Sequence, residues 1–483
     1  MSSLQSPFLI LALLTLSGCS LIPPYRLPAV EIPAAFKEAP AEGQWKAAEP
    51  AEDAARGEWW KIFADPVLDD LESRAATANQ DLQAALARLK QALAIHQNAR
   101  SALFPQIGVG AGPTRQRPSP TSQGLPADAE TNAFTLWRAQ TTVAYEADLF
   151  GRIGSGAEAA AAGAEQQEAL LRSVQLAVQA DVAQTYFSLR ELDALVSLYA
   201  ETVSLREQSH KVFQRRFDEG DISELDLARS RTELTSARSD ALGIARQRAV
   251  TEHTLAILLG DTPSSFTFAP HPLTRISAHV PPGLPSALLE RRPDIAAAER
   301  AMAAANARIG AARAAYFPRL NLTGTLGYES AELGDLFKWS SRAFVMGPLV
   351  GTILSLPVFD GGARRAQMDQ ARAAYEEEMA NYRQAILRAF KEVEDNLVHL
   401  RLIEEQTRVQ DDAIIASRRA ATLSKLQYQE GSVSNLSVID ANRTMLQQQR
   451  ISVILDAEKA RATVNLIRAL GGGWDVDALR RPE

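Results

Sequence analysis

The sequence predicts a mainly helical protein that also supplies strands to a transmembrane β-barrel, built from one fold unit that occurs twice. The first observation is the duplication, in which motifs recur in the same order about 211 residues apart. The second is a stretch in each copy where apolar and polar residues alternate, which is typical of a strand. The third is a long proline-free stretch after those strands, which predicts a long helix. We therefore expect four barrel strands and long coiled-coil helices in each chain.

The matching motifs cover both halves of the chain. They are Phe104-Pro105 with Phe317-Pro318, Leu149–Arg152 with Phe359–Gly362, Phe217–Ser223 with Tyr428–Ser434, and Leu259-Gly260 with Leu470-Gly471. Their order and spacing predict a first repeat at residues 58–260 and a second at 286–474. The remaining segments are then a signal peptide (1–18), an extended tether (19–57), a connector or equatorial region (261–285) and a C-terminal tail (475–483).

The N-terminus has the features of a lipoprotein signal peptide. Phe8 to Leu16 is a short apolar run that ends in Leu16–Cys19, and small residues before a cleavage point are typical of a signal peptide. The ending resembles the bacterial lipobox, which implies an N-acyl and a diacylglycerol lipid on Cys19. Since this is the only cysteine, the chain forms no internal disulfide. Met1 to Pro7 carries no Lys or Arg, so either translation starts elsewhere or the amine alone supplies the positive charge. In the lipoprotein pattern an Asp directly after the cysteine favours retention in the inner membrane, so Ser20 is compatible with the outer membrane.

Composition excludes several classes of function. The net charge of −7 leaves no basic footprint for nucleic acid. There is no Walker phosphate loop, and the six histidines lack metal-ligand spacing. We therefore expect neither an enzyme nor a metal or cofactor site. The segment after the lipobox, up to about Gly57, is rich in Pro, Ala and Glu, and indicates an extended tether between the lipid and the folded body.

The strand pattern is clearest from Trp137 to Leu149, where apolar and polar residues fall on opposite faces, and it recurs at Leu320–Tyr328. An apolar exterior with a polar interior is typical of a membrane barrel, although a half-buried sheet of a soluble domain alternates in the same way. Gln106–Gly112 and Ala343–Pro357 are the other two expected strands. The smallest barrels have about eight strands, so four per chain must be shared between subunits.

Helices account for most of the remaining sequence. Asp65 to Leu103 has helical spacing of leucines. Gly151–Gly220 and Gly361–Gly431 contain no proline, and at about 1.5 Å per residue each reaches roughly 100 Å. Their apolar residues step by three or four, as in coiled coils. Shorter helices are expected to return along Asp221–Leu259 and Ser432–Leu470.

With these features the chain resembles the TolC-like outer membrane efflux proteins, in the lipoprotein branch of RND efflux systems (OprM-like or NodT-like). The motifs that carry the resemblance are Trp59-Trp60 with Phe63, Asp65-Pro66, Arg291–Asp294, Phe359–Gly362 and Leu470–Trp474. The resemblance implies a homotrimer with ~12 strands in one outer-membrane barrel, standing on an α-helical barrel that extends into the periplasm. It also implies a passive exit duct that docks on a periplasmic adaptor (membrane fusion) protein and an inner-membrane RND-type transporter.

The resemblance also assigns roles to the two glycine turns and the helices above them. A glycine suits the left-handed end of a helix, and the periplasmic tips that meet the adaptor would be Glu219, Gly220, Asp221, Glu430, Gly431 and Ser432. Charged residues above the tips are the candidates for a gate that closes the pore: Glu201, Arg206, Asp411, Asp412, Arg418 and Arg419. A plain helix end and a solvated helix face are the alternatives for these two sets.

A pore-less periplasmic coiled-coil lipoprotein, acting as a scaffold or tether, is the competing interpretation. Such a scaffold gives no reason for the alternation at Trp137–Leu149. The sequence does not name the cargo, because the resemblance places specificity mostly in the pump.

Overall fold

The computed structural model describes residues 21–30, 32–33, 35–38, 58–271, 292–347 and 353–472. Several predicted features lie outside these residues. They are Cys19 with its predicted lipid, the motif residues Arg291, Gly473 and Trp474, Pro348 of the expected fourth strand, and the connector beyond His271. The chain forms two compact units, and each takes segments from both repeats. The first unit comprises Met1–Ala29, Arg88–Glu168 and Ala297–Tyr382, and the second comprises Val30–Ala87, Ala169–Ala296 and Arg383–Glu483.

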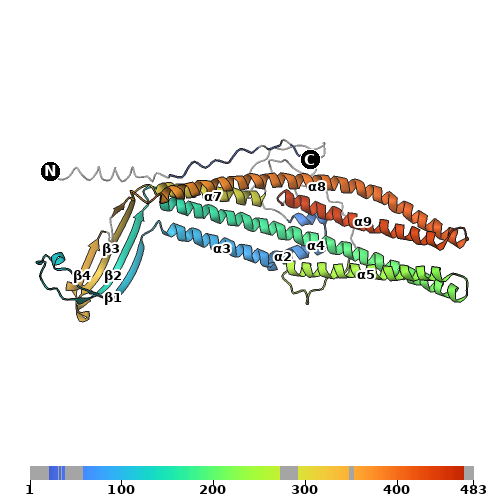
Figure 1. The fold of residues 1–483 in the computed structure, drawn as a ribbon, viewed down its shortest axis with the longest axis horizontal. Helices are drawn as coiled ribbons and strands as arrows, with labels where there is room; N and C mark the ends of the chain where they lie inside the picture. Colours follow the sequence, from blue (N-terminus) through green and yellow to red (C-terminus); the bar gives the residue numbers. More distant parts are fainter. Residues whose placement is uncertain are drawn as a thin grey trace. The chain divides into compact units, whose positions relative to one another are not determined.

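Matching helices of the two repeats have equal lengths, which confirms the duplicated architecture. α3 (Gln80–Ser101) and α7 (Pro293–Ala314) have 22 residues each, α4 (Arg152–Asp218) and α8 (Ala363–Gln429) have 67, and α5 (Glu224–Leu258) and α9 (Asn435–Ala469) have 35. Figure 1 shows α4 turning into α5 and α8 turning into α9. None of the helices in the described part of the chain is long and apolar enough to cross a lipid bilayer.

The helix expected from Asp65 to Leu103 is in fact two helices, α2 (Pro66–Ala78) and α3, which meet at Asn79. The Asn79 side chain accepts hydrogen bonds from the N–H groups of Asp81 and Leu82 at 2.9 and 3.1 Å. Its amide donates to the Leu258 carbonyl at 2.9 Å. An asparagine that caps a new helix and also binds a distant carbonyl interrupts the helix without disturbing the leucine spacing.

The strands form one antiparallel sheet in the order β1-β2-β3-β4, all within the first unit (Figure 1). β1 (Gln106–Gln116) and β2 (Phe134–Ala147) come from the first repeat, and β3 (Arg319–Ser330) pairs with β2. Among the described residues, the expected fourth strand at Ala343–Pro357 is represented by β4 (Arg342–Met346) and β5 (Leu354–Ser355), which both pair with β3.

The register of the sheet confirms the predicted alternation. Val109, Thr141, Leu326 and Phe344 lie opposite one another across the four strands, so they share a face. Val109 and Leu326 on this face are 85 % and 67 % exposed. On the other face Arg138 lies opposite Glu329, and its Nε is 2.7 Å from Glu329 Oε2. One face of the sheet is therefore apolar and exposed, and the other carries charges.

The largest core of the second unit explains two of the sequence motifs. Trp59 and Trp60 of a short 3-10 helix (Trp59–Phe63) are buried in it beside residues of α2, α4, α5 and α9. Asp65 caps α2, since its side chain accepts from Val67 N–H at 3.0 Å and from Leu68 N–H at 3.4 Å, and Pro66 takes the first helical position.

The motif around Arg292 fastens the start of α7. The Arg292 guanidinium binds both carboxylate oxygens of Asp294 at 3.0 and 2.6 Å, Glu392 of α8 at 2.7 Å, and the Ala469 carbonyl at the end of α9 at 2.9 Å. A bidentate guanidinium of this kind gives both strength and a fixed orientation. The motif is thus a structural junction of the second unit.

Candidate functional site at the helix turns

The two turns between long and returning helices have the same backbone geometry. Gly220 and Gly431 have φ angles of 80° and 77°, in the left-handed region that favours glycine. In both turns two hydrogen bonds close the Schellman motif. They are Gly220 N–H to Phe217 O (2.9 Å), Asp221 N–H to Arg216 O (2.8 Å), Gly431 N–H to Tyr428 O (3.0 Å) and Ser432 N–H to Gln427 O (2.9 Å).

The side chains of the two turns differ. Ser223 caps α5 by accepting from Asp226 N–H at 3.2 Å, whereas Ser434 before α9 makes no side-chain cap. The first turn of α5 contains Glu224 and Asp226, and that of α9 contains no acidic residue. Acidic side chains at a helix N-terminus are stabilised by the helix dipole. The first turn therefore presents more negative charge than the second.

Above the turns, one buried carboxylate joins three helices. Glu233 of α5 forms ion pairs with Arg206 of α4 and with Arg443 of α9. Arg206 Nη1 also donates to the Glu233 carbonyl at 3.3 Å. Burial, followed by the nearby charge of Arg443, lowers the pKa of Arg206 from its ordinary value. This cluster links the helix pair of the first repeat to a helix of the second.

The cluster occurs once per chain, although the helices occur twice. The starts of α4 and α8, Arg152 and Ala363, lie 211 residues apart. The same shift replaces Glu233 by Thr444, Arg206 by Ser417, and Arg443 by Thr232, so the repeat-related position carries no charge. The two repeats are therefore alike in backbone and different in how they are joined.

The other gate candidates lie apart from this cluster. Glu201, Asp412, Arg418 and Arg419 are exposed, and none of them forms a side-chain ion pair with another residue that the structure describes. Asp411 is half-buried. Among the six candidates, Arg206 of α4 forms an ion pair with Glu233 of α5. No group of acidic, histidine or cysteine side chains in the described segments could hold a metal ion.

The sequence did not indicate Glu233, Arg443, Arg216 or Tyr428. Arg216 Nη1 donates to the Tyr428 hydroxyl. Glu233 and Arg443 form an ion pair although they are 210 residues apart in the sequence. Helical spacing shows which residues share a face of one helix, but it does not pair residues of different helices. The one available signal was the mismatch between repeats at these positions.

Comparison with known proteins identifies the family. The chain matches the family described as "Outer membrane efflux protein" over residues 71–261 and 284–472. "Probable efflux pump outer membrane protein TtgC" of Pseudomonas putida is 35% identical over 462 residues, which cover 95% of this chain and 93% of the relative. "Outer membrane protein OprJ" of Pseudomonas aeruginosa is 32% identical over 469 residues, covering 96% and 95%.

Solved structures agree with this assignment. The structure described as the open state of the Neisseria gonorrhoeae MtrE outer membrane channel matches with a TM-score of 0.78 at 28% identity, over 94% of this chain and 98% of that chain. The members of the outer membrane efflux protein family are channels rather than enzymes. This chain therefore belongs to the outer membrane efflux protein family, and it is the outer-membrane channel of an efflux pump.

Proposed function

We propose that the chain forms a homotrimeric, lipid-anchored exit duct in the bacterial outer membrane, which extends into the periplasm and serves a tripartite efflux pump. A periplasmic adaptor and an inner-membrane RND-type transporter are the proposed partners, and the transporter supplies the energy. The lipobox that ends in Cys19 supports the anchor. TtgC, which is described as an efflux pump protein, supports the partners.

The observation that carries this proposal is the antiparallel sheet, in which β4 and β5 together take the fourth strand position and one face is apolar and exposed. β1 and β4 end the strand order, so each leaves a row of backbone groups without a neighbouring strand in the sheet. Such groups must be paired in lipid, and a closed barrel pairs them all. Because about eight strands is the lower limit for closure, strands from other copies must complete the ring, and three copies supply ~12.

The gate is proposed to lie in the helices above the turns, among Glu201, Arg206, Asp411, Asp412, Arg418 and Arg419. Asp412, Arg418 and Arg419 are exposed in the single chain and thus available to a second copy. Arg206 is held by Glu233 within the chain. The tip residues Glu219, Gly220, Asp221, Glu430, Gly431 and Ser432 are the proposed adaptor contacts, because they form the exposed ends of both turns.

The test combines subunit counting with conductance. Native mass spectrometry of the purified lipidated protein should give a trimer, and planar bilayers should show low, rarely open conductance. Conductance should rise in the triple variant Asp411→Ala/Asp412→Ala/Arg419→Ala. Arg365→Ala is the control, since Arg365 lies on the same helix, outside the proposed gate, and its side chain is exposed. A monomer without conductance in any variant would favour the pore-less scaffold instead.

A further inference from the structure

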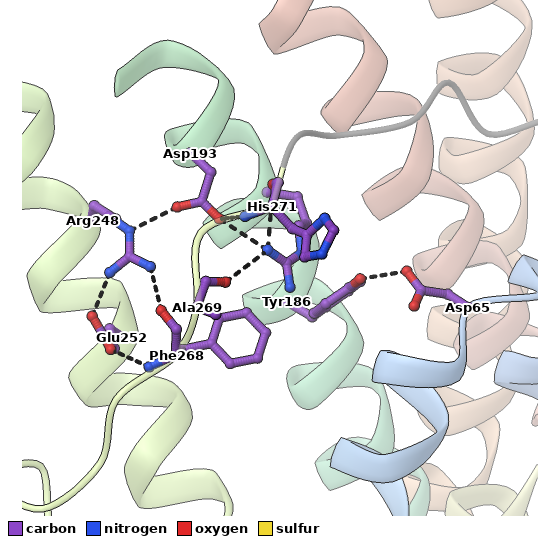
Figure 2. A network of polar contacts seen from close by, with 9 residues as sticks. Asp65, Tyr186, Asp193, Arg248, Glu252, Phe268, Ala269 and His271 are labelled. Atoms are coloured by element: carbon purple, nitrogen blue, oxygen red, sulfur yellow. Dashed lines mark hydrogen bonds and ion pairs between the residues drawn. The ribbon is translucent and has the colours of Figure 1, made fainter. Parts of the chain in front are cut away.

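The first part of the connector is docked on α4 and α5 by a network of charged side chains (Figure 2). Asp193 of α4 binds Arg190 at 3.0 Å and Arg248 of α5 at 2.7 Å. Glu252 of α5 binds Arg248 at 2.5 Å. These four side chains face the segment 268–271, so the segment that follows α5 is held in place.

The network recognises the backbone of that segment. Arginines bind its carbonyl groups: Arg248 binds Phe268 O at 2.7 Å, and Arg190 binds Ala269 O and His271 O at 3.3 Å each. Carboxylates bind its N–H groups: Glu252 accepts from Phe268 at 2.6 Å and Asp193 from His271 at 3.0 Å.

An aromatic side chain anchors the same segment. The Phe268 ring is buried, and the Arg190 guanidinium lies 4.5 Å from its centroid and 4.8 Å from that of Tyr186. A guanidinium between two rings gains from their negative faces while its edges remain free for hydrogen bonds. The bound segment 268–271 thus carries one buried phenylalanine and backbone groups that pair with charged side chains.

The duplication places a related set of charges on the second repeat. The shift of 211 residues that relates α4 to α8 brings Arg190 to Arg401, Asp193 to Glu404 and Arg248 to Lys459. Lys459 Nζ lies 3.2 Å from Glu404 Oε1, so the ion pair between the long and the returning helix is present again. Arg401 takes no part in that pair and binds elsewhere.

The second site holds the N-terminal segment. Arg401 binds the Glu38 carboxylate at 2.6 Å. Glu394 of α8, which replaces Ala183 of the first repeat, accepts from Lys37 N–H at 2.7 Å and from Glu38 N–H at 3.0 Å. Phe36 is buried. The two sites share three features. A repeat-related arginine binds oxygen atoms of the segment, which are backbone carbonyls for Arg190 and the Glu38 carboxylate for Arg401. A carboxylate accepts from backbone N–H groups, and the segment contains one buried phenylalanine.

We infer that the second repeat carries a docking site for the N-terminal segment, related by duplication to the site that holds residues 268–271. Its ligand is the segment 36–38, in which the buried Phe36 precedes a turn that presents the Lys37 and Glu38 N–H groups and the Glu38 carboxylate. The segment predicted to be a tether is therefore fixed to the protein at Lys37 and Glu38 by Glu394 and Arg401 of α8. This holding requires neither the lipid on Cys19 nor the proposed trimer.

Hydrogen exchange on the full-length protein tests the inference. Arg401→Glu or Glu38→Arg should raise the exchange rates of the Lys37 and Glu38 amides by about 10-fold, because an opened segment loses its protection. The double variant Glu38→Arg/Arg401→Glu should restore slow exchange. Arg408→Glu, an exposed position on the same helix, should leave the rates unchanged.

A second variant keeps the inference falsifiable if a charge reversal disturbs folding. Glu394→Gln weakens the acceptor of both amides while Arg401 and Glu38 remain, and it should also speed their exchange. Slow exchange at buried Val464 of α9 marks an intact fold in every variant. Unchanged rates in the two single reversals and in Glu394→Gln would overturn the docking site, and so would a failure of the double reversal to restore protection. Neither outcome depends on conductance or subunit count.

Discussion

Arg216 Nη1 donates a hydrogen bond to the Tyr428 hydroxyl across 3.0 Å, and this contact joins the last turns of α4 and α8. The repeat-related residues are Gln427 and Phe217, which cannot form the same bond because phenylalanine has no hydroxyl. In the proposed trimer, the matching interface between chains would bring these two residues together. This hydrogen bond therefore joins the tips of the two repeats within one chain.

Tyr428→Phe should loosen the closed tips. The change removes one hydrogen bond to a charged donor, worth about 1.5–3 kcal/mol, and keeps the ring. Open probability in planar bilayers should rise by roughly 10-fold. The converse variant, Phe217→Tyr/Gln427→Arg, supplies the missing pair at the repeat-related position and should lower it. A rise in both variants, or in neither, would contradict a role for this bond in closure.

Asp193 and Glu404 form a matched pair for testing stability. Their side chains are 2 % and 75 % exposed, and each binds a cation of the returning helix. Asp193→Ala leaves Arg190 and Arg248 without their shared carboxylate, and removal of one partner of a buried ion pair costs about 3–5 kcal/mol. Glu404→Ala removes an exposed pair worth roughly 0–1 kcal/mol. Thermal unfolding in detergent should show a much lower Tm for Asp193→Ala alone, and equal Tm values would count against the burial argument.

Gly260 and Gly220 separate two causes of strain. Both glycines have positive φ angles, 73° and 80°. A Cβ on Gly260 would lie 2.5 Å from the Ala78 carbonyl oxygen, whereas none of the described atoms lies within 4 Å of a Cβ on Gly220. Gly220→Ala should cost only the left-handed backbone term of about 1–2 kcal/mol. Gly260→Ala should lower Tm further, because backbone atoms of α2 must also move.

Much of the fold could be predicted from periodicity, because a face that is buried or set in lipid repeats with the period of its element. The alternation from Trp137 to Leu149 and the proline-free stretches of α4 and α8 are of this kind. The break at Asn79 could not be predicted this way, since the side chain that interrupts the helix lies between two stretches of unbroken leucine spacing.

The candidate site was less predictable than the fold. The glycine turns were found because Gly220 and Gly431 recur, and their left-handed geometry requires glycine. The charge cluster on Glu233 was not, because ion pairing depends on how separate helices are placed. Glu72 shows the same limit, since in sequence it is one more acidic residue on a helix, and only the packing of α2 reveals that it is buried.

Glu72 of α2 predicts a pH dependence of stability. Its side chain is 1 % exposed, and neither carboxylate oxygen has a hydrogen-bond partner among the residues that the structure describes. Burial, with a smaller effect of the nearby Asp69 charge, raises the pKa of Glu72 from its ordinary value of 4.5 to about 9. Below pH 4.5 the folded and unfolded chains both hold this proton, so the group adds no slope there. Between pH 4.5 and about 9 only the folded chain keeps it, so stability falls as pH rises.

Glu72→Gln should remove this dependence, because an amide does not ionise. From pH 5 to pH 8 the wild-type free energy of unfolding should fall by roughly 4 kcal/mol relative to the variant, at about 1.4 kcal/mol per pH unit. Asp70→Asn, an exposed position on the same helix, is the control and should follow the wild type. Tm measured in detergent at several pH values gives the comparison. Parallel curves for the wild type and Glu72→Gln would show that Glu72 is ionised or solvated in the folded protein. A carboxylate that ionises alike in the folded and unfolded chains adds no pH dependence to the free energy of unfolding.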